Sequence, residues 1–223
     1  MFERPENDYL LNIMGYQRIQ RFLDALKTPL PVTSSALHSF SLATVLNDIT
    51  INNRQNILEF GCGVSTIVIA KYLQIFDLPG KIYSVEEDKN WVNFLQKKMI
   101  SEKLEDKVEL IFAPIETNVQ TQKKWYAADF IERFIAEKTV FDLLIIDGPQ
   151  AWRPADFEIR KNVPDAVFGL LAEKFSLYLD DTNRKGEARA VKEWSKKHSL
   201  KFVELPSKTS VAVRGKRHNF SIL

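Results

Sequence analysis

Short apolar runs alternate with amphipathic stretches along most of the chain after residue 55. The apolar runs are rich in Ile, Leu, Val and Phe and predict β-strands at residues 56–60, 81–86, 107–112, 141–147 and 174–180. Between these runs, apolar positions recur at helical spacing and predict helices at residues 64–76, 88–101, 121–138, 153–171 and 186–198. The chain is therefore predicted to repeat a strand–helix–strand unit.

This repeat implies parallel strands joined by crossover helices. Residues 141–146, with the sequence FDLLII, are apolar almost throughout, as expected for a central parallel strand that is buried on both faces. Near the end, residues 201–205 and 209–214 predict two strands whose connection is too short for a crossover helix. The sequence thus predicts a Rossmann-like, doubly wound α/β fold, with a mainly parallel seven-stranded sheet and a C-terminal antiparallel hairpin.

Two more helices are predicted before the first strand, at residues 15–26 and 34–49, on either side of the sequence TPLP at 28–31. We interpret residues 1–55 as an N-terminal helical cap and residues 56–223 as the core of one overall domain. The cap is expected to cover the carboxyl edge of the sheet and to help close a site there.

Composition agrees with one globular domain, because 45% of the 223 residues are hydrophobic and 27% are charged. The net charge of +2 provides no strong field for nucleic acid or an anionic membrane, so we expect neither as a partner. The basic run at residues 214–218 is interpreted as a solvated tail, with an anionic partner as the alternative. The oligomeric state stays open.

Cysteine content and hydropathy indicate the compartment. Cys62 is the only cysteine, so an internal disulfide cannot form. The first residues lack the pattern of a signal peptide, and there is no run of about 18 apolar residues that would span a membrane. A cytoplasmic location is therefore expected.

The turn after the first predicted strand is suited to cofactor binding. Gly61 and Gly63 permit a tight turn and let a ligand approach the backbone closely. Ser65 and Thr66 can cap the following helix. Thr66 stands where the fingerprint of dinucleotide-binding proteins has its third glycine, which argues against a dinucleotide.

Two carboxylates favour a positively charged ligand instead. Glu59 lies at the mouth of the loop, where it would repel a phosphate at about 4 Å by about 4 kcal/mol at an effective dielectric near 20. S-adenosylmethionine carries an ammonium and a sulfonium group that the same carboxylate attracts. Glu86 ends the second strand, close to the spacing of an acid that binds ribose hydroxyls. The alternative is that Glu86 only starts the next helix, where acids interact favourably with the dipole.

The motif Glu59-x-Gly61-x-Gly63, the acid at the end of the second strand and the terminal hairpin together resemble the class I S-adenosylmethionine-dependent methyltransferases. The resemblance covers roughly residues 56–216. It implies that the methionine part of S-adenosylmethionine is surrounded by Glu59, Gly61, Gly63 and Ser65. It also implies that Glu86 holds the ribose and that Pro114 lies near the adenine.

Three acids follow the fourth and fifth predicted strands, namely Asp147, Asp180 and Asp181. If these strands are neighbours, the three carboxylates converge on one edge of the sheet and need a cation, a shared proton or water between them. One interpretation is a site for Mg²⁺ or another divalent cation, which would orient a substrate hydroxyl and lower its pKa. This arrangement resembles the metal-dependent O-methyltransferases, including the catechol type.

The candidate catalytic base is Asp147, because Gln150 stands where catechol-type enzymes carry a lysine. The alternative interpretation is structural. Residues 181–183 would then form a turn and cap for the next helix, and Asp147 would only order the turn at Gly148 and Pro149.

Other residues are candidates for contacts with a substrate. His38 can act as a base or lie on a helix surface, and Arg153 can bind an anionic group or be an ordinary surface arginine. Trp125, Tyr126 and Trp152 are candidates for a substrate wall or for the core.

The function predicted from these residues is S-adenosylmethionine-dependent O-methylation of a hydroxyl on a small molecule or glycan. Methylation of amino groups on nucleic-acid bases is disfavoured, because residues 147–150 (DGPQ) differ from the Asn/Asp-Pro-Pro-aromatic tetrad of those enzymes. Two alternatives are left open: a nicotinamide-dependent oxidoreductase, and a non-catalytic binding protein on the same fold.

Overall fold

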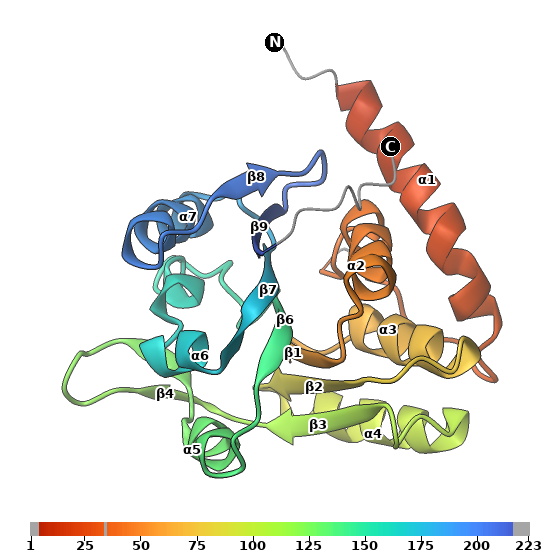
Figure 1. Ribbon diagram of the computed structural model, residues 1–223, viewed down its shortest axis with the longest axis horizontal. Helices are drawn as coiled ribbons and strands as arrows, with labels where there is room; N and C mark the ends of the chain where they lie inside the picture. The colour runs from red at the N-terminus through yellow and green to blue at the C-terminus, as the bar shows by residue number, and fades with distance from the viewer. Residues whose placement is uncertain (1–4, 34, 216–223) are drawn as a thin grey trace.

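The computed structural model describes residues 5–33 and 35–215 (Figure 1). One sheet of seven strands, in the order β3-β2-β1-β6-β7-β9-β8, forms its centre. The strands pair in parallel as far as β7, and β9 is antiparallel to both of its neighbours. The strands are β1 (Asn56–Phe60), β2 (Lys81–Glu86), β3 (Val108–Phe112), β6 (Phe141–Ile146), β7 (Leu171–Leu179), β8 (Phe202–Glu204) and β9 (Ser210–Arg214). The predicted Rossmann-like fold with its terminal hairpin is confirmed.

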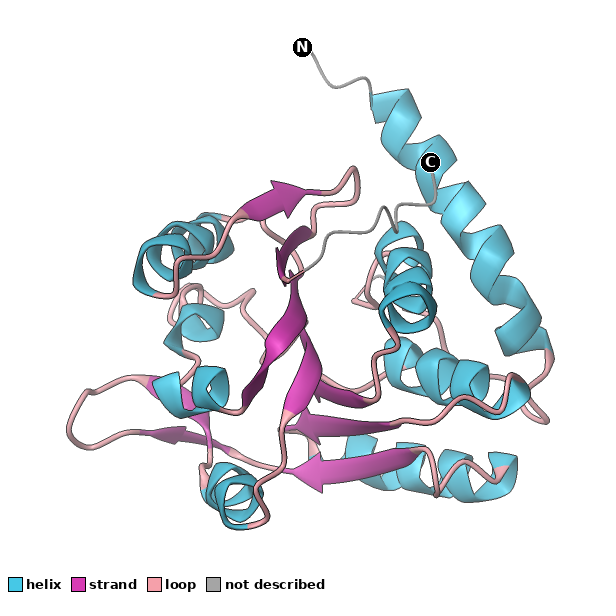
Figure 2. Cartoon of the chain, in the orientation of Figure 1, coloured by secondary structure: helices cyan, strands magenta, loops and turns pink. Residues whose placement is uncertain are grey.

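Helices cover both faces of this sheet (Figures 1 and 2). One face carries α1 (Pro5–Asp24), α2 (Ser39–Asn52), α3 (Val64–Ile75) and α4 (Lys89–Glu102). The other face carries α5 (Asp129–Ala136), the 3₁₀ helix η1 (Ile159–Asn162), α6 (Asp165–Gly169) and α7 (Lys185–Lys197).

Alternate residues of the central strands supply the core on either side. Ile57 and Leu143 point into the apolar cluster beneath α1–α4, whereas Leu58 and Leu144 point into the cluster beneath η1 and α5–α7. All four side chains are fully buried. Successive side chains of a strand point to opposite faces, so a strand covered on both faces must be apolar at nearly every position.

The strand order reverses between β1 and β6. From β1 the chain runs outward through β2 and β3, and it then returns to place β6 and β7 on the other side of β1. In open α/β sheets, the carboxyl ends of the strands at such a reversal border a crevice that binds ligands.

The predicted helix at residues 121–138 is wrong in its first half. Residues 124–126 form β5 (Lys124–Tyr126), which pairs antiparallel with β4 (Ile115–Thr117) in a small second sheet, and α5 begins only at Asp129. Trp125 and Tyr126 are buried aromatic residues, which favour strands. The Asn118 side chain accepts two backbone N–H groups in the connecting turn and so closes the hairpin.

The predicted helix at residues 153–171 is also wrong. This segment contains only turns, the short helices η1 and α6, and the start of β7. Pro164 stands at the N-cap of α6, where it has no N–H to donate, and Val163 before it is extended, as residues preceding proline usually are.

Of the N-terminal helices, α2 covers the sheet face rather than its carboxyl edge, and α1 packs on the outer side of α2 and α3 (Figure 1). α1 starts ten residues earlier than predicted and α2 starts five residues later. Phe22 of α1 packs against Tyr72 of α3 and against Phe76, with ring centroids 5.3 and 6.2 Å apart. Within the basic run at 214–218, residues 216–218 lie outside the described part of the chain. Among the described residues, no helix combines the length and apolar character needed to cross a membrane.

A buried ion pair fastens α2 to the sheet. Nε of Arg54 lies 3.2 Å from Oδ1 of Asp48, and both side chains are at most 5% exposed. The guanidinium of Arg54 also donates to the hydroxyl of Ser176 at 2.8 Å and to the carbonyl of Lys174 at 3.1 Å. The hydroxyl of Tyr178 donates to the other oxygen of Asp48 at 3.2 Å. Loss of either Arg54 or Asp48 would therefore leave the other charge buried without a counter-charge.

The substitution Asp48→Asn should lower the free energy of unfolding by about 3–5 kcal/mol, because it leaves the buried guanidinium of Arg54 without its counter-charge. Urea unfolding followed by circular dichroism measures the change. The exposed Asp106→Asn substitution is the control and should stay within about 0.5 kcal/mol of the original protein. A loss below 1 kcal/mol for Asp48→Asn would show that the pair is dispensable.

Candidate functional site

A cavity of about 630 Å³ opens at the carboxyl ends of β1, β2, β6 and β7. Its wall combines the loop after β1, the acids at the end of β2 and the residues that follow β6 and β7. Residues 31, 33 and 35–38 of the α1–α2 connection complete the wall. The N-terminal segment thus contributes to the cavity through its connecting loop, and the reversal of strand order provides the crevice that the fold predicts.

Two glycines let the loops after β1 and β6 meet. Gly61 has φ of 91°, and a Cβ added there would lie only 2.8 Å from the backbone nitrogen of Gly148. A Cβ on Gly148 would in turn lie 2.7 Å from the nitrogen of Gly61. The N–H of Gly148 donates to the carbonyl of Phe60 at 2.7 Å. Backbone therefore packs on backbone at this point, and any side chain would force the two loops apart.

Gly63 has the opposite surroundings. It lines the cavity, and an added Cβ would meet no atom within 4 Å. Its N–H donates to the hydroxyl of Thr66 at 2.9 Å, which orders the start of α3. The absence of a side chain at Gly63 leaves space for a ligand beside the backbone, as the sequence predicts.

Glu59 lies beneath this loop and is fully buried. Its carboxylate accepts hydrogen bonds from the hydroxyls of Ser65 and Thr66 at 2.5 Å and from that of Ser84 at 2.6 Å. Burial raises the pKa of Glu59 above its ordinary value, although the three hydroxyls act in the other direction. Glu59 is not among the residues that line the cavity, whereas Ser65 is. Glu59 therefore fastens β1, β2 and α3 together, a role that the sequence pattern did not reveal.

Glu86 lies on the cavity wall and is 7% exposed. Its two oxygens accept the backbone N–H groups of Cys62 at 3.1 Å and Asp88 at 2.9 Å. Burial, together with the charge of neighbouring Glu87, raises the pKa of Glu86 to about 7. The helix-start interpretation applies to Asp88, whose carboxylate caps α4, and not to Glu86.

Pro114 is the one predicted cofactor residue that lies away from both the cavity wall and the residues beneath it. It is exposed, and its carbonyl accepts the N–H of Ala127 at 2.8 Å, next to the β4–β5 hairpin. A contact between Pro114 and an adenine ring stays a prediction.

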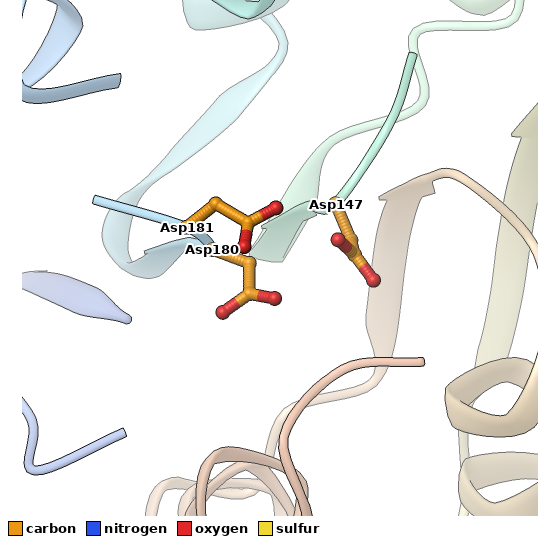
Figure 3. A group of neighbouring side chains, drawn as sticks. All are labelled: Asp147, Asp180 and Asp181. Carbon is orange, nitrogen blue, oxygen red and sulfur yellow. The ribbon is translucent and has the colours of Figure 1, made fainter. Parts of the chain in front are cut away.

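Asp147, Asp180 and Asp181 form an acidic cluster at the ends of β6 and β7 (Figure 3). One carboxylate oxygen from each lies within 4.8 Å of the others. The expected convergence follows from the parallel pairing of β6 with β7, and the N–H of Asp180 donates to the carbonyl of Ile146 at 3.0 Å. All three residues line the cavity.

Arg160, which the sequence analysis did not identify, lies inside this cluster. Its side chain is 6% exposed, and its guanidinium is 3.4 Å from Asp147 and 3.0 Å from Asp181. It also donates to the backbone carbonyls of Asp147 and Pro149 and lies 3.8 Å from buried Glu187. Arg160 sits in a segment predicted as one regular helix, so its position in the sequence gave no indication that it would turn inward.

Carboxyl groups outnumber cationic groups in this region. Four carboxyl groups, including that of Glu187, surround two guanidiniums, those of Arg160 and Arg184. Burial and the nearby charge of Asp180 hold the pKa of Asp147 well above its usual range. Burial raises the pKa of Asp180 to about 6. A donor set of oxygens alone, with more carboxyl groups than cationic groups around it, fits a hard divalent cation such as Mg²⁺ or Ca²⁺.

The structural interpretation of residues 181–183 is partly correct. The carbonyl of Asp181 accepts the N–H of Arg184 in a turn, and Asp181 has φ of 57°. However, the N-cap of α7 is Arg184, which makes no side-chain capping bond. Thr182 bonds through its hydroxyl to the carbonyl of Lys208 at 3.1 Å. The Asp181 carboxylate is thus free of a capping role and is turned toward Arg160.

Some of the residues predicted to contact a substrate line the cavity, and others lie in the hydrophobic core. His38 and Trp152 line the cavity, and the Trp152 side chain is 66% exposed. Arg153 lies over the ring of Trp152, 5.0 Å from its centroid, and does not line the cavity. Trp125 and Tyr126 are buried in the core beneath the loops.

Comparison with known families gives one match. A model of the family described as a methyltransferase domain matches residues 58–182, which is more than half of the chain. The matched region contains the loop after β1, Glu86 and the acidic cluster. The sequence matches none of the curated proteins with which it was compared.

Solved methyltransferase structures share the fold. A Podospora anserina methyltransferase bound to S-adenosylhomocysteine is 13% identical, with a TM-score of 0.63 over 97% of this chain and 98% of its own. TomG, an O-methyltransferase of tomaymycin synthesis from Streptomyces achromogenes solved with S-adenosylmethionine, is 13% identical, with a TM-score of 0.57 over 96% and 100%. A Bacillus cereus O-methyltransferase bound to S-adenosylhomocysteine is 15% identical, with a TM-score of 0.52 over 96% and 93%. At such identities the likeness establishes the fold.

The raised pKa of Glu86 predicts a pH effect on stability. Because the folded pKa of about 7 exceeds the ordinary value of 4.5, the stabilisation from its bound proton is complete below pH 4.5 and is lost as the pH rises through 7. The Glu86→Gln variant cannot lose this proton. Relative to the original protein, its free energy of unfolding should therefore rise by about 2–3 kcal/mol between pH 4.5 and pH 8.

Urea unfolding at several pH values measures this difference, with the exposed Glu105→Gln substitution as the control. A difference between Glu86→Gln and the original protein that stays constant with pH would contradict the raised pKa.

Proposed function

The chain belongs to the family of class I S-adenosylmethionine-dependent methyltransferase domains, and from this premise we propose that it methylates a hydroxyl oxygen of a small molecule or glycan. The observation that carries the proposal is the presence of Gly63, Glu86 and the acidic cluster on the wall of one cavity. The donor-binding loop and a group of oxygen ligands thus face the same space.

The loop after β1 and the acids after β2 support the assignment of one end of the cavity to the methyl donor. Gly61, Gly63 and Ser65 offer backbone and a hydroxyl beside open space for the methionine part, and Glu86 offers carboxylate oxygens to the ribose. Glu86 and Glu87 make this end of the cavity negative, which favours a positively charged donor and disfavours the phosphates of a dinucleotide. Buried Glu59 supports the loop from below.

Methyl transfer from S-adenosylmethionine requires no covalent bond between substrate and protein. The sulfonium of the donor activates the methyl group, so catalysis consists of alignment and removal of the acceptor proton. Asp147 is our candidate base, because its carboxylate lies at the reacting edge of the sheet and is only partly exposed. Its raised pKa makes this carboxylate a stronger base than an ordinary aspartate.

The acidic cluster is our candidate site for Mg²⁺ or another divalent cation, held by Asp147, Asp180 and Asp181. The excess of carboxyl groups over cationic groups around the cluster supports this assignment, because Arg160 contacts only Asp147 and Asp181 among its three acids. Such a cation, when bound, supplies a positive charge that lowers the pKa of an acceptor hydroxyl. His38 and Trp152, at the same cavity, are available to contact the acceptor.

Donor binding is tested by the Gly63→Ala substitution. The added methyl group meets no protein atom but enters the space assigned to the donor, so the affinity for S-adenosylmethionine should fall at least about tenfold, or about 1.4 kcal/mol. Isothermal titration calorimetry measures it. Gly169→Ala is a matched control, because a Cβ there also meets no atom and the residue lies away from the cavity. If the original protein ignores both S-adenosylmethionine and S-adenosylhomocysteine at millimolar concentration, methyl transfer is excluded.

The cation is tested by chelation. With a panel of hydroxylated acceptors and radiolabelled donor, EDTA should reduce methyl transfer at least about 100-fold, and added Mg²⁺ should restore it. The Asp180→Asn variant should need more Mg²⁺ for the same rate. Full activity in EDTA would remove the cation from the proposal and leave Asp147 to act without it.

A further inference from the structure

A chain of three buried hydroxyls leads from the acidic cluster into the body of the protein. The hydroxyl of Thr209 donates to Oδ1 of Asp180 at 2.6 Å. The hydroxyl of Ser41 lies 2.6 Å from that of Thr209 and also 2.6 Å from that of Ser207. Ser41 and Thr209 are fully buried and Ser207 is 2% exposed, so bulk water does not compete for these bonds.

The number of hydroxyl protons fixes which group donates in each of these hydrogen bonds. Each hydroxyl has one proton to donate. Thr209 gives its proton to Asp180 at 2.6 Å rather than to the carbonyl of Ser207 at 3.4 Å, so it accepts from Ser41. Ser41 then has no proton left for Ser207 and accepts from it. All three hydroxyl dipoles therefore point toward one oxygen of Asp180.

The three hydrogen-bonded hydroxyls come from parts of the fold that are distant in sequence. Ser41 belongs to α2, Ser207 to the β8–β9 turn and Thr209 to the end of that turn before β9. The separations of Ser41 from Ser207 and Thr209 are 166 and 168 residues. The contact thus forms only in the folded protein. It holds the carboxylate of Asp180 from the side of β9, opposite β6, the strand that Asp147 follows.

From this geometry we infer that Thr209, supported by Ser41 and Ser207, is a positioning residue that orients Asp180 for cation binding. The inference rests on the cation site of the proposed function. Thr209 engages Oδ1 of Asp180, which restricts rotation of the carboxyl group and presents it to the cluster in one orientation. Groups that hold a metal ligand in this way typically change metal affinity by about 10–100-fold when removed.

The matched control lies one residue away. Ser210 is also buried and also bears a hydroxyl, but it donates to the hydroxyl of Thr182 at 3.0 Å instead of to Asp180. Substitution of Ser210 therefore reports the general cost of losing a buried hydroxyl at the start of β9.

The experiment measures Mn²⁺ binding to the protein alone, without donor or acceptor, from the electron paramagnetic resonance signal of free Mn²⁺. Thr209→Val keeps the shape but removes the hydroxyl, and its Mn²⁺ affinity should fall about 10–100-fold. Thr209→Ser restores the donor and should stay within about threefold of the original protein, as should Ser210→Ala. Ser41→Ala, which acts only through Thr209, should give a smaller loss in the same direction and serves if Thr209→Val does not fold.

Equal Mn²⁺ affinity in Thr209→Val, Ser41→Ala and the original protein would overturn the inference. If the original protein itself binds no Mn²⁺, the cation in the proposed function fails, and a crystal structure of Thr209→Val then decides the positioning role separately. A rotated Asp180 carboxyl group in that structure supports the role, and an unmoved one overturns it.

Discussion

The site depends on the contact between two backbones where the order of the strands reverses. Gly61 and Gly148 follow neighbouring parallel strands, and each occupies the place where a Cβ of the other would lie. This contact sets the distance between the loop after β1 and the residues after β6. Glu59 strengthens it from below by holding three hydroxyls, so the loop has a defined shape without a ligand. Rigid support of this kind is what precise alignment of two reactants requires.

Electrostatics divide the cavity into two negative regions with different surroundings. At the end of β2, Glu86 accepts two backbone N–H groups, and the charge of Glu87 opposes its ionisation. At the ends of β6 and β7, the acidic cluster contains a buried guanidinium that offsets only part of its charge. A positively charged donor suits the first region and a compact ion of higher charge suits the second. In the proposed function, these two regions would place the donor and the acceptor hydroxyl in the same cavity.

Much of the fold could be predicted because the rules that govern it act locally. Residues 141–146 are apolar on both faces of a strand, and this pattern identifies a central parallel strand directly. The errors at residues 121–138 and 153–171 arose where a helical spacing of apolar residues was overridden by a tight hairpin turn and by Pro164. The acidic cluster followed from neighbouring strand ends. Arg160 did not, because it lies in an irregular segment and meets Asp147 and Asp181 only through the tertiary fold.

Arg160 also has a consequence for how the protein matures. Three carboxylates with no counter-charge from the protein would repel one another, and a protein of that kind would need a bound cation before the site could close. Here the guanidinium comes from the chain itself and joins the ends of two strands and the start of α7. The fold can therefore close without a bound cation, so a cation at the proposed site would affect activity rather than folding.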